Sequence, residues 1–177
     1  MRILRRAVTF LGCSLAAALS WAVQSSAGLD EYVKKPDPTY AWKYVETKSF
    51  PGDVKVHHLN VTSQTWKDIV WNHVVSIVEP KEQLHPDAAV LYICGGKIGD
   101  NPRQGDLAVG LAIAANTKSR VVVLPQVPNQ PLLGNKTEDT LIAETFVRYL
   151  DTRDEEWPLL FPMVKSAIRA MDAAQAF

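Results

Sequence analysis

Cysteine is scarce in this 177-residue chain, which has only Cys13 and Cys94. Cys13 falls in an N-terminal stretch with the pattern of a removable leader, so the mature chain would keep Cys94 alone and form no internal disulfide. An excess of basic residues is also missing, because 19 Lys and Arg balance 19 Asp and Glu. This balance gives no indication of nucleic-acid binding. The chain has no internal repeats and no low-complexity tract.

The signatures of several enzyme classes are absent as well. The stretch Gly95–Gly99 lacks the G-x-G-x-x-G spacing of dinucleotide-binding proteins, and no Gly-Lys-Ser/Thr triplet closes it as in a P-loop. No G-x-S-x-G elbow is present, and all four histidines precede the place where a hydrolase nucleophile would follow. We therefore predict no nucleotide cofactor and no complete Ser-His-Asp triad.

The histidines do not indicate a metal site. His57 and His58 are adjacent in a stretch that predicts a β-strand, where successive side chains point to opposite faces. A metal ion needs convergent ligands, often with carboxylate support. We therefore interpret the histidines as solvated or packed side chains and predict no metal.

Residues 1–27 have the pattern of a secretory signal peptide. Three arginines precede an apolar run over residues 7–19, and Ser25-Ser26-Ala27 supplies the small residues of a cleavage site. A membrane anchor is the alternative, but the run is shorter than the roughly 20 residues that span a bilayer. Cys13 faintly resembles a lipoprotein site, although Phe10 fits poorly, and we interpret it as an apolar leader residue. We predict export, periplasmic or secreted, with no membrane attachment after cleavage.

The first half of the mature chain predicts strands. Pro36-Asp37-Pro38 indicates an extended arm over residues 28–40. Three short runs, over residues 42–50, 54–61 and 69–78, are rich in β-branched residues and closely spaced, which predicts an antiparallel meander. In the third run the apolar residues divide between two faces, with Trp71, Val75 and Ile77 on one and Val70, Val74 and Val78 on the other.

The second half alternates strand and helix, which is typical of an α/β fold. Ala88–Cys94 is a near-continuous apolar run that predicts a central strand buried on both faces, and residues 120–124 predict another. Between them Asp100 or Asn101 can cap a helix. Two further helices follow, over residues 138–150 and from Trp157 to the C-terminus. In the first, the residues predicted to face the core are Leu141, Ile142, Phe146, Tyr149 and Leu150. In the second, the apolar residues that repeat at helical spacing are Leu160, Phe161, Val164, Ile168 and Met171.

Gly95-Gly96, directly after the 88–94 run, permits two interpretations. Without Cβ atoms the backbone can approach a ligand closely and point its N–H groups at an anion. In α/β hydrolases one N–H of the oxyanion hole comes from such a loop. The commoner use of a glycine pair is a tight turn that only connects strand to helix. The residues alone leave both open.

From about Leu29 to Phe177 the chain resembles the N-terminal part of the PhoPQ-activated pathogenicity-related proteins. The most specific matching segments are Pro128-Asn129-Gln130-Pro131-Leu132 and the helix segment that runs from Pro162-Met163 to Met171-Asp172. The strand and turn Leu91–Gly96 match as well. The resemblance implies an exported protein with an α/β-hydrolase-like fold: a three-layer α/β arrangement, with helices on both faces of the sheet and antiparallel strands at the N-terminus.

In that family the chain continues past the last helix into a strand and a Gly-x-Ser-Lys-Arg-Gly-Trp elbow. This sequence ends at Phe177. We therefore expect residues 28–177 to form the N-terminal portion of the domain, with an incomplete sheet, no catalytic residue and no activity. Of the functional residues of that family, the resemblance assigns only the oxyanion loop to this sequence, at Gly95, Gly96 and Lys97. A small-molecule or peptide substrate is implied for full-length members. The alternative is a secreted binding or signalling protein with no catalytic role.

Overall fold

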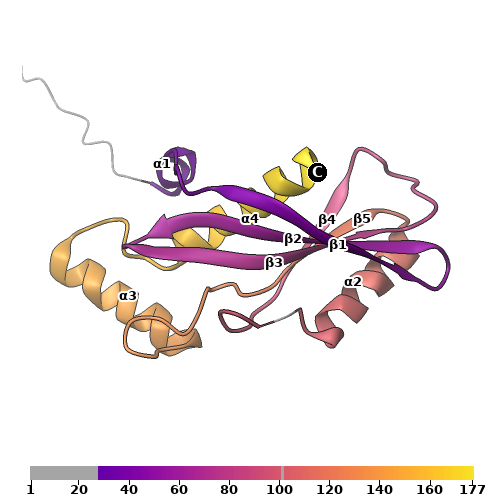
Figure 1. Ribbon diagram of the computed structural model, residues 1–177. Coiled ribbons are helices and arrows are strands. Elements are labelled where there is room, and N and C mark those ends of the chain that lie inside the picture. Colours follow the sequence, from indigo (N-terminus) through magenta and orange to yellow (C-terminus); the bar gives the residue numbers. More distant parts are fainter. Residues whose placement is uncertain (1–27, 101) are drawn as a thin grey trace, which may run out of the picture.

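The computed structural model describes residues 28–100 and 102–177 (Figure 1). The predicted leader, including Cys13, and the possible cap Asn101 lie outside these residues. The elements in chain order are α1 (Leu29–Lys34), β1 (Ala41–Phe50), β2 (Val54–Trp66), β3 (Ile69–Glu79), β4 (Ala89–Ile93), α2 (Gln104–Thr117), β5 (Arg120–Leu124), α3 (Glu138–Thr152) and α4 (Leu160–Ala176). No helix in the described part of the chain is long and apolar enough to cross a membrane.

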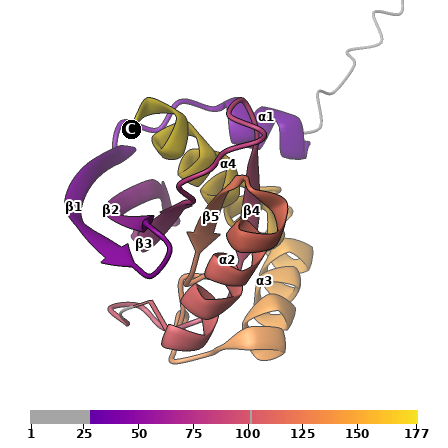
Figure 2. The ribbon, with the colours of Figure 1, turned by 90° about the vertical axis from the view of Figure 1, so that its right-hand side faces the viewer.

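The five strands form one mixed sheet in the order β1-β2-β3-β5-β4. The predicted antiparallel meander β1-β2-β3 is confirmed, and β3 pairs antiparallel with β5. The pair β4 and β5 is parallel, with α2 as the crossover between them. Helix α4 covers one face of the sheet and α2 packs on the other (Figures 1 and 2). The predicted α/β class is therefore confirmed.

Two β-bulges redirect side chains from one face of the sheet to the other. In β1 the bulge lies between Tyr44 and Glu46. Tyr44, before it, stacks with its ring centroid 5.8 Å from that of Phe177, beside the end of α4. Lys48, beyond the bulge, lines a cavity on the α2 side. A second bulge in β2, between Thr62 and Gln64, gives Ser63 and Gln64 the same face.

The central parallel strand is β5, and the prediction of a central, doubly buried strand at Ala88–Cys94 is wrong for the structure described. All four residues Val121–Leu124 are buried. In contrast, within the described residues β4 pairs only with β5 and lies at the sheet edge, where Val90 and Ile93 are 37% and 46% exposed. An apolar run shows that a strand tolerates burial, but it does not identify the neighbour that would cover it.

The predicted extended arm over residues 28–40 is also wrong in its first half, which forms α1. The helix ends before Pro36, as the restriction on the residue preceding proline requires. Tyr32 on α1 is buried, and its hydroxyl donates to Gln64 Oε1 at 2.8 Å. Lys165 Nζ donates to the carbonyl of Lys35 at 2.9 Å, at the C-terminal end of the helix. These long-range contacts stabilise a helix too short to form alone.

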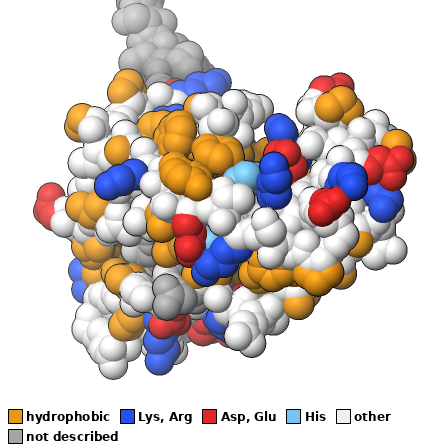
Figure 3. Space-filling model, turned by 45° about the vertical axis from the view of Figure 1, so that its right-hand side comes forward, with side chains coloured by type: hydrophobic (Ala, Val, Ile, Leu, Met, Phe, Trp, Pro, Cys, Tyr) orange, Lys and Arg blue, Asp and Glu red, His pale blue; other side chains and the backbone are white. Residues whose placement is uncertain are grey.

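Only part of the apolar stripe of α4 faces inward, because Phe161 and Met171 pack against the core and the other three residues do not. Leu160, Val164 and Ile168 are exposed, whereas Lys165 and Ser166 are buried with Ala170. In α3, Phe146 and Leu150 are likewise exposed. Helical periodicity groups residues onto one face, but it does not decide which face meets the sheet. Hydrophobic side chains also gather in patches on the face of the molecule drawn in Figure 3.

Candidate functional site

The glycine loop, residues Gly95–Asp100, follows the carboxyl end of β4 and is held there by one side chain. Gln126 Nε2 donates to the carbonyls of Lys97 and Asp100, at 3.2 and 2.8 Å. The Gln126 backbone N–H donates to the carbonyl of Gly95 at 3.1 Å. Gln126 is buried, and its Oε1 accepts from the N–H of Val74 on β3 at 3.2 Å. One side chain thus fastens the glycine loop to the middle of the sheet.

Of the three predicted oxyanion residues, two have N–H groups without a partner. In the described part of the chain, neither the Gly95 N–H nor the Gly96 N–H makes a hydrogen bond. The Lys97 N–H donates to Asp100 Oδ2 at 2.9 Å. Gly96 has φ +137°, and a Cβ there would lie 3.5 Å from Arg103 Nη2 and from Gln126 N. This conformation requires glycine. The two free N–H groups lie near both the Arg103 guanidinium and the Glu138 carboxylate, whose Oε1 would be 4.0 Å from a Cβ at Gly95, and free N–H groups in such a loop can bind an anion.

The buried segment Pro125–Gln130 carries two further amide side chains that fix it in place. Asn129 Nδ2 donates to the carbonyl of Asn72 on β3 at 2.7 Å. Gln130 Oε1 accepts from the N–H of Glu138, the first residue of α3, at 2.8 Å. The sequence did not reveal these roles. Polar amides closely spaced between prolines were a usable signal, because a loop that buries its backbone must satisfy it internally.

Cys94 lies just before the glycine loop, but its thiol is a poor nucleophile. Burial, reinforced by the nearby Asp106 carboxylate, raises the pKa of Cys94 to about 12. Because the thiolate is the reactive form, the thiol stays protonated and unreactive at neutral pH.

We expect native Cys94 to react with a thiol reagent about 1000-fold more slowly than free cysteine at pH 8, since its pKa lies more than three units above that of a free thiol. The measurement is the release of thionitrobenzoate from Ellman's reagent by the Cys13→Ser chain, in which Cys94 is the one remaining thiol, with and without 6 M guanidinium. The denatured chain serves as the control and should react at the ordinary rate. Equal rates in both solutions would contradict the protonated state.

A buried chain of polar side chains crosses the core between α1, β2, β3 and α4. Gln64 Nε2 donates to Ser166 Oγ at 3.1 Å, and Ser166 Oγ lies 3.0 Å from Ser63 Oγ. Ser63 Oγ lies 3.0 Å from His73 Nε2. His73 Nδ1 is 3.1 Å from the carbonyl of Pro125, which can only accept, so Nδ1 carries the proton. Ser166 is thus a hydrogen-bonding hub between β2 and α4.

The Ser63–His73 pair is not a catalytic dyad. Ser63 and His73 are 0% and 2% exposed, so substrate cannot reach them in this conformation. His73 Nδ1 faces a neutral carbonyl, where a triad has a carboxylate. Burial lowers the pKa of His73 to about 4, so the ring is neutral at pH 7. The pair instead links α4 to the segment that carries Gln126.

The other histidines are dispersed. His57 faces the α4 side, with Nδ1 2.8 Å from Thr47 Oγ1, whereas His58 faces the α2 side, with Nδ1 2.9 Å from Ser76 Oγ. The predicted opposite orientation of these two rings is confirmed. Within residues 28–100 and 102–177, no three His, Cys, Asp or Glu side chains are placed to hold a metal ion.

The chain is similar to known proteins over most of its length. The family model for PhoPQ-activated pathogenicity-related protein matches residues 29–177. A similar protein is autocrine proliferation repressor protein A of Dictyostelium discoideum, 34% identical over 167 residues, covering 86% of this chain and 33% of the relative. The chain thus spans about a third of that relative's length. No solved structure matches. The chain belongs to the PhoPQ-activated pathogenicity-related protein family.

Proposed function

We propose that this chain provides the oxyanion side of an exported, α/β-hydrolase-like protein and has no hydrolytic activity by itself. The observation that carries the proposal is the pair of unpartnered N–H groups of Gly95 and Gly96 at the carboxyl end of β4. In open α/β sheets, ligands bind outside the carboxyl ends of the parallel strands. Hydrolases use N–H groups in such a loop to stabilise the developing oxyanion.

The free edge of β4 supports the same proposal. A hydrolase nucleophile stands on a sharp turn between a strand and a helix. A further strand paired in parallel with β4 would end beside the glycine loop and cover Val90 and Ile93, which are exposed at this edge. Its elbow would thereby bring a serine next to the Gly95 and Gly96 donors. The leader pattern of residues 1–27 supports export.

The first test asks whether the chain alone is inactive. We expect the full chain to hydrolyse neither p-nitrophenyl butyrate nor a fluorogenic peptide faster than buffer, because its sequence contains no G-x-S-x-G elbow. Activity that follows the protein through every purification step would contradict the proposal.

The second test addresses the oxyanion role in a full-length family member that carries the elbow. Replacing its counterpart of Gly95 with proline removes one N–H without adding charge. We expect kcat to fall about 100-fold with KM nearly unchanged, the usual effect of deleting an oxyanion donor. The counterpart of Gly105 replaced with alanine is the control, since a Cβ there meets open space. Equal activity of the two variants would contradict an oxyanion role for the Gly95 N–H group.

A second candidate function is extracellular signalling without catalysis. The observation that favours it is the name of the Dictyostelium relative, an autocrine proliferation repressor. The decisive comparison uses a full-length member whose elbow serine is replaced with alanine. Retained partner capture and biological effect would support signalling, whereas loss of the effect together with hydrolysis would support an enzyme acting on a small molecule or peptide.

A further inference from the structure

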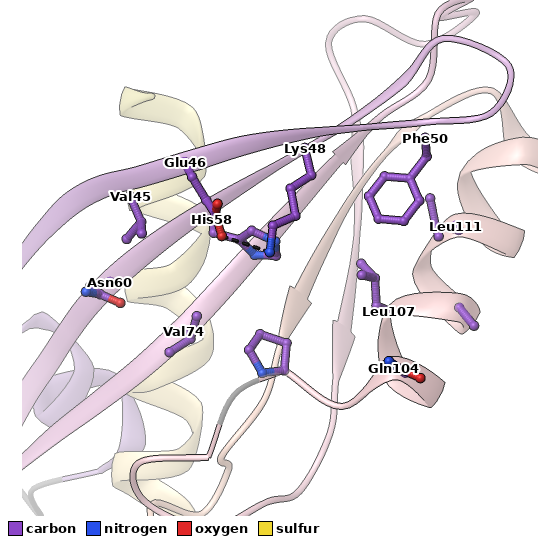
Figure 4. A pocket seen from close by; sticks show the side chains of 12 residues that line it. Val45, Glu46, Lys48, Phe50, His58, Asn60, Val74, Gln104, Leu107 and Leu111 are labelled. Carbon is purple, nitrogen blue, oxygen red and sulfur yellow. Dashed lines mark ion pairs between the residues drawn. The ribbon is translucent and has the colours of Figure 1, made fainter.

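A cavity of about 760 Å³ lies between the β1-β2-β3 meander and α2, and none of its lining residues belongs to the glycine loop (Figure 4). Its volume falls in the range of small-molecule sites. The packing of α2 explains its position. A Cβ at Gly110 would lie 2.6 Å from Val123 Cγ2, so the helix sits directly against β5. The α2-side face of β1 and β2 is left uncovered.

The walls of this cavity are mainly apolar and are formed by the strands on one side and by α2 on the other. Phe50 on β1 lies across from Leu107 and Leu111 on α2, and Val45 and Val74 extend the apolar lining along the strands (Figure 4). The bulge in β1 shifts the side-chain alternation at this point, so Val45 and the residue after it both line the cavity. Bulges of this kind commonly re-aim side chains at binding sites.

The polar end is built around a buried histidine. His58 is 7% exposed and its Nδ1 is 2.9 Å from Ser76 Oγ, while Nε2 has no hydrogen-bond partner in the described part of the chain. Beside it, Lys48 Nζ lies 2.9 Å from Glu46 Oε1 (Figure 4). Both side chains of this ion pair are about half exposed, and exposed pairs contribute little, so Lys48 can exchange its partner at low cost.

We propose that this cavity binds an amphipathic carboxylate, a ligand with one aromatic or aliphatic body and one carboxylate. The body occupies the apolar walls formed by Phe50, Leu107 and Leu111. The carboxylate replaces Glu46 at the Lys48 ammonium and accepts a hydrogen bond from His58 Nε2. Ser76 donates to Nδ1 in this arrangement, which leaves the proton on Nε2 and directs it to the ligand.

The test is equilibrium dialysis of the full chain against 2-naphthoate, with 2-naphthalenemethanol and 2-naphthylmethylamine as comparison ligands of the same shape. We expect one saturable site for 2-naphthoate and binding at least about tenfold weaker for the alcohol and the amine, which lack the charge that Lys48 pairs with. Equal or tighter binding of either comparison ligand, or no saturable binding of 2-naphthoate, would overturn the proposal.

Matched variants locate the site. Ala108 lines the cavity and is exposed, so Ala108→Trp fills the cavity without disturbing the core. Its neighbour Val109 is exposed as well but does not line the cavity, which makes Val109→Trp the control. We expect Ala108→Trp to weaken 2-naphthoate binding at least about tenfold and Val109→Trp to leave it unchanged. Lys48→Gln should weaken binding, and Lys43→Gln, on the same strand outside the cavity, should not. Equal effects within either pair would place the ligand elsewhere.

Discussion

Gln126→Leu is expected to cost about 3 kcal/mol of unfolding free energy, the largest effect of any single substitution considered for this chain. The leucine fits the volume but removes the acceptor for the Val74 N–H and the donor for the carbonyls of Lys97 and Asp100. The half-buried Val74 N–H in the middle of the sheet would lose its acceptor, whereas the two loop carbonyls can turn to water. The measurement is the urea denaturation midpoint followed by circular dichroism.

Gln175→Leu is the matched control, because Gln175 is exposed near the end of α4, and it should shift stability by less than about 0.5 kcal/mol. Amide hydrogen exchange supplies a local readout. In Gln126→Leu, the hydrogen-bonded amides of Lys97, Ile98 and Asp100 should lose protection even under conditions where the rest of the sheet remains folded. A Gln126 variant as stable as the Gln175 variant would show that the backbone alone holds the glycine loop.

Acidification from pH 7 to pH 5 is expected to destabilise the fold through His73. Burial lowers the pKa of this histidine to about 4 in the folded chain, against about 6.5 when unfolded. Between these values the unfolded state binds more protons, so stability is complete above pH 6.5 and falls as the pH drops towards 4. The full pKa shift corresponds to about 3 kcal/mol of unfolding free energy, and about 2 kcal/mol of this stabilisation is lost by pH 5.

The measurement is the free energy of unfolding in urea at several pH values between 5 and 7.5. The pKa values of His57 and His58 are lowered mainly by burial, so they add to the same slope, and only a His73 variant isolates its share. His73→Gln should flatten the dependence on pH by about one proton, while Gln175→Leu, which removes no titratable group, should leave it unchanged. An unaltered slope in His73→Gln would assign the effect to the other groups.

Much of the fold could be predicted because local patterns determined it. Alternating apolar residues marked the three strands of the meander. In β3, the predicted division between two faces is confirmed, because Val75 and Ile77 pack in the core on the α4 side and Val78 packs on the α2 side with α2. Val74 lies on the α2 side as well. The run over residues 120–124 became the fully buried β5. These features depend on short-range periodicity, which the sequence records directly.

The features that could not be predicted depend on long-range partners. The position of β4 at the edge follows from the strand order, which a single apolar run does not encode. The inward face of α4 is set by hydrogen bonds of Lys165 and Ser166 to residues more than 100 positions away. The glycine loop was found as a candidate, but its anchor Gln126 was not, because a glutamine in a loop resembles any solvated side chain.

The outer face of α4 has its own consequence. Hydrogen bonds have strict angular requirements, whereas apolar contacts have almost none. On α4 the hydrogen-bonding groups point inward and Leu160, Val164 and Ile168 point outward. The rotation and axial position of the helix are therefore fixed by its inner face alone. The outer face can therefore vary in the size and shape of its side chains without moving the sheet or the glycine loop.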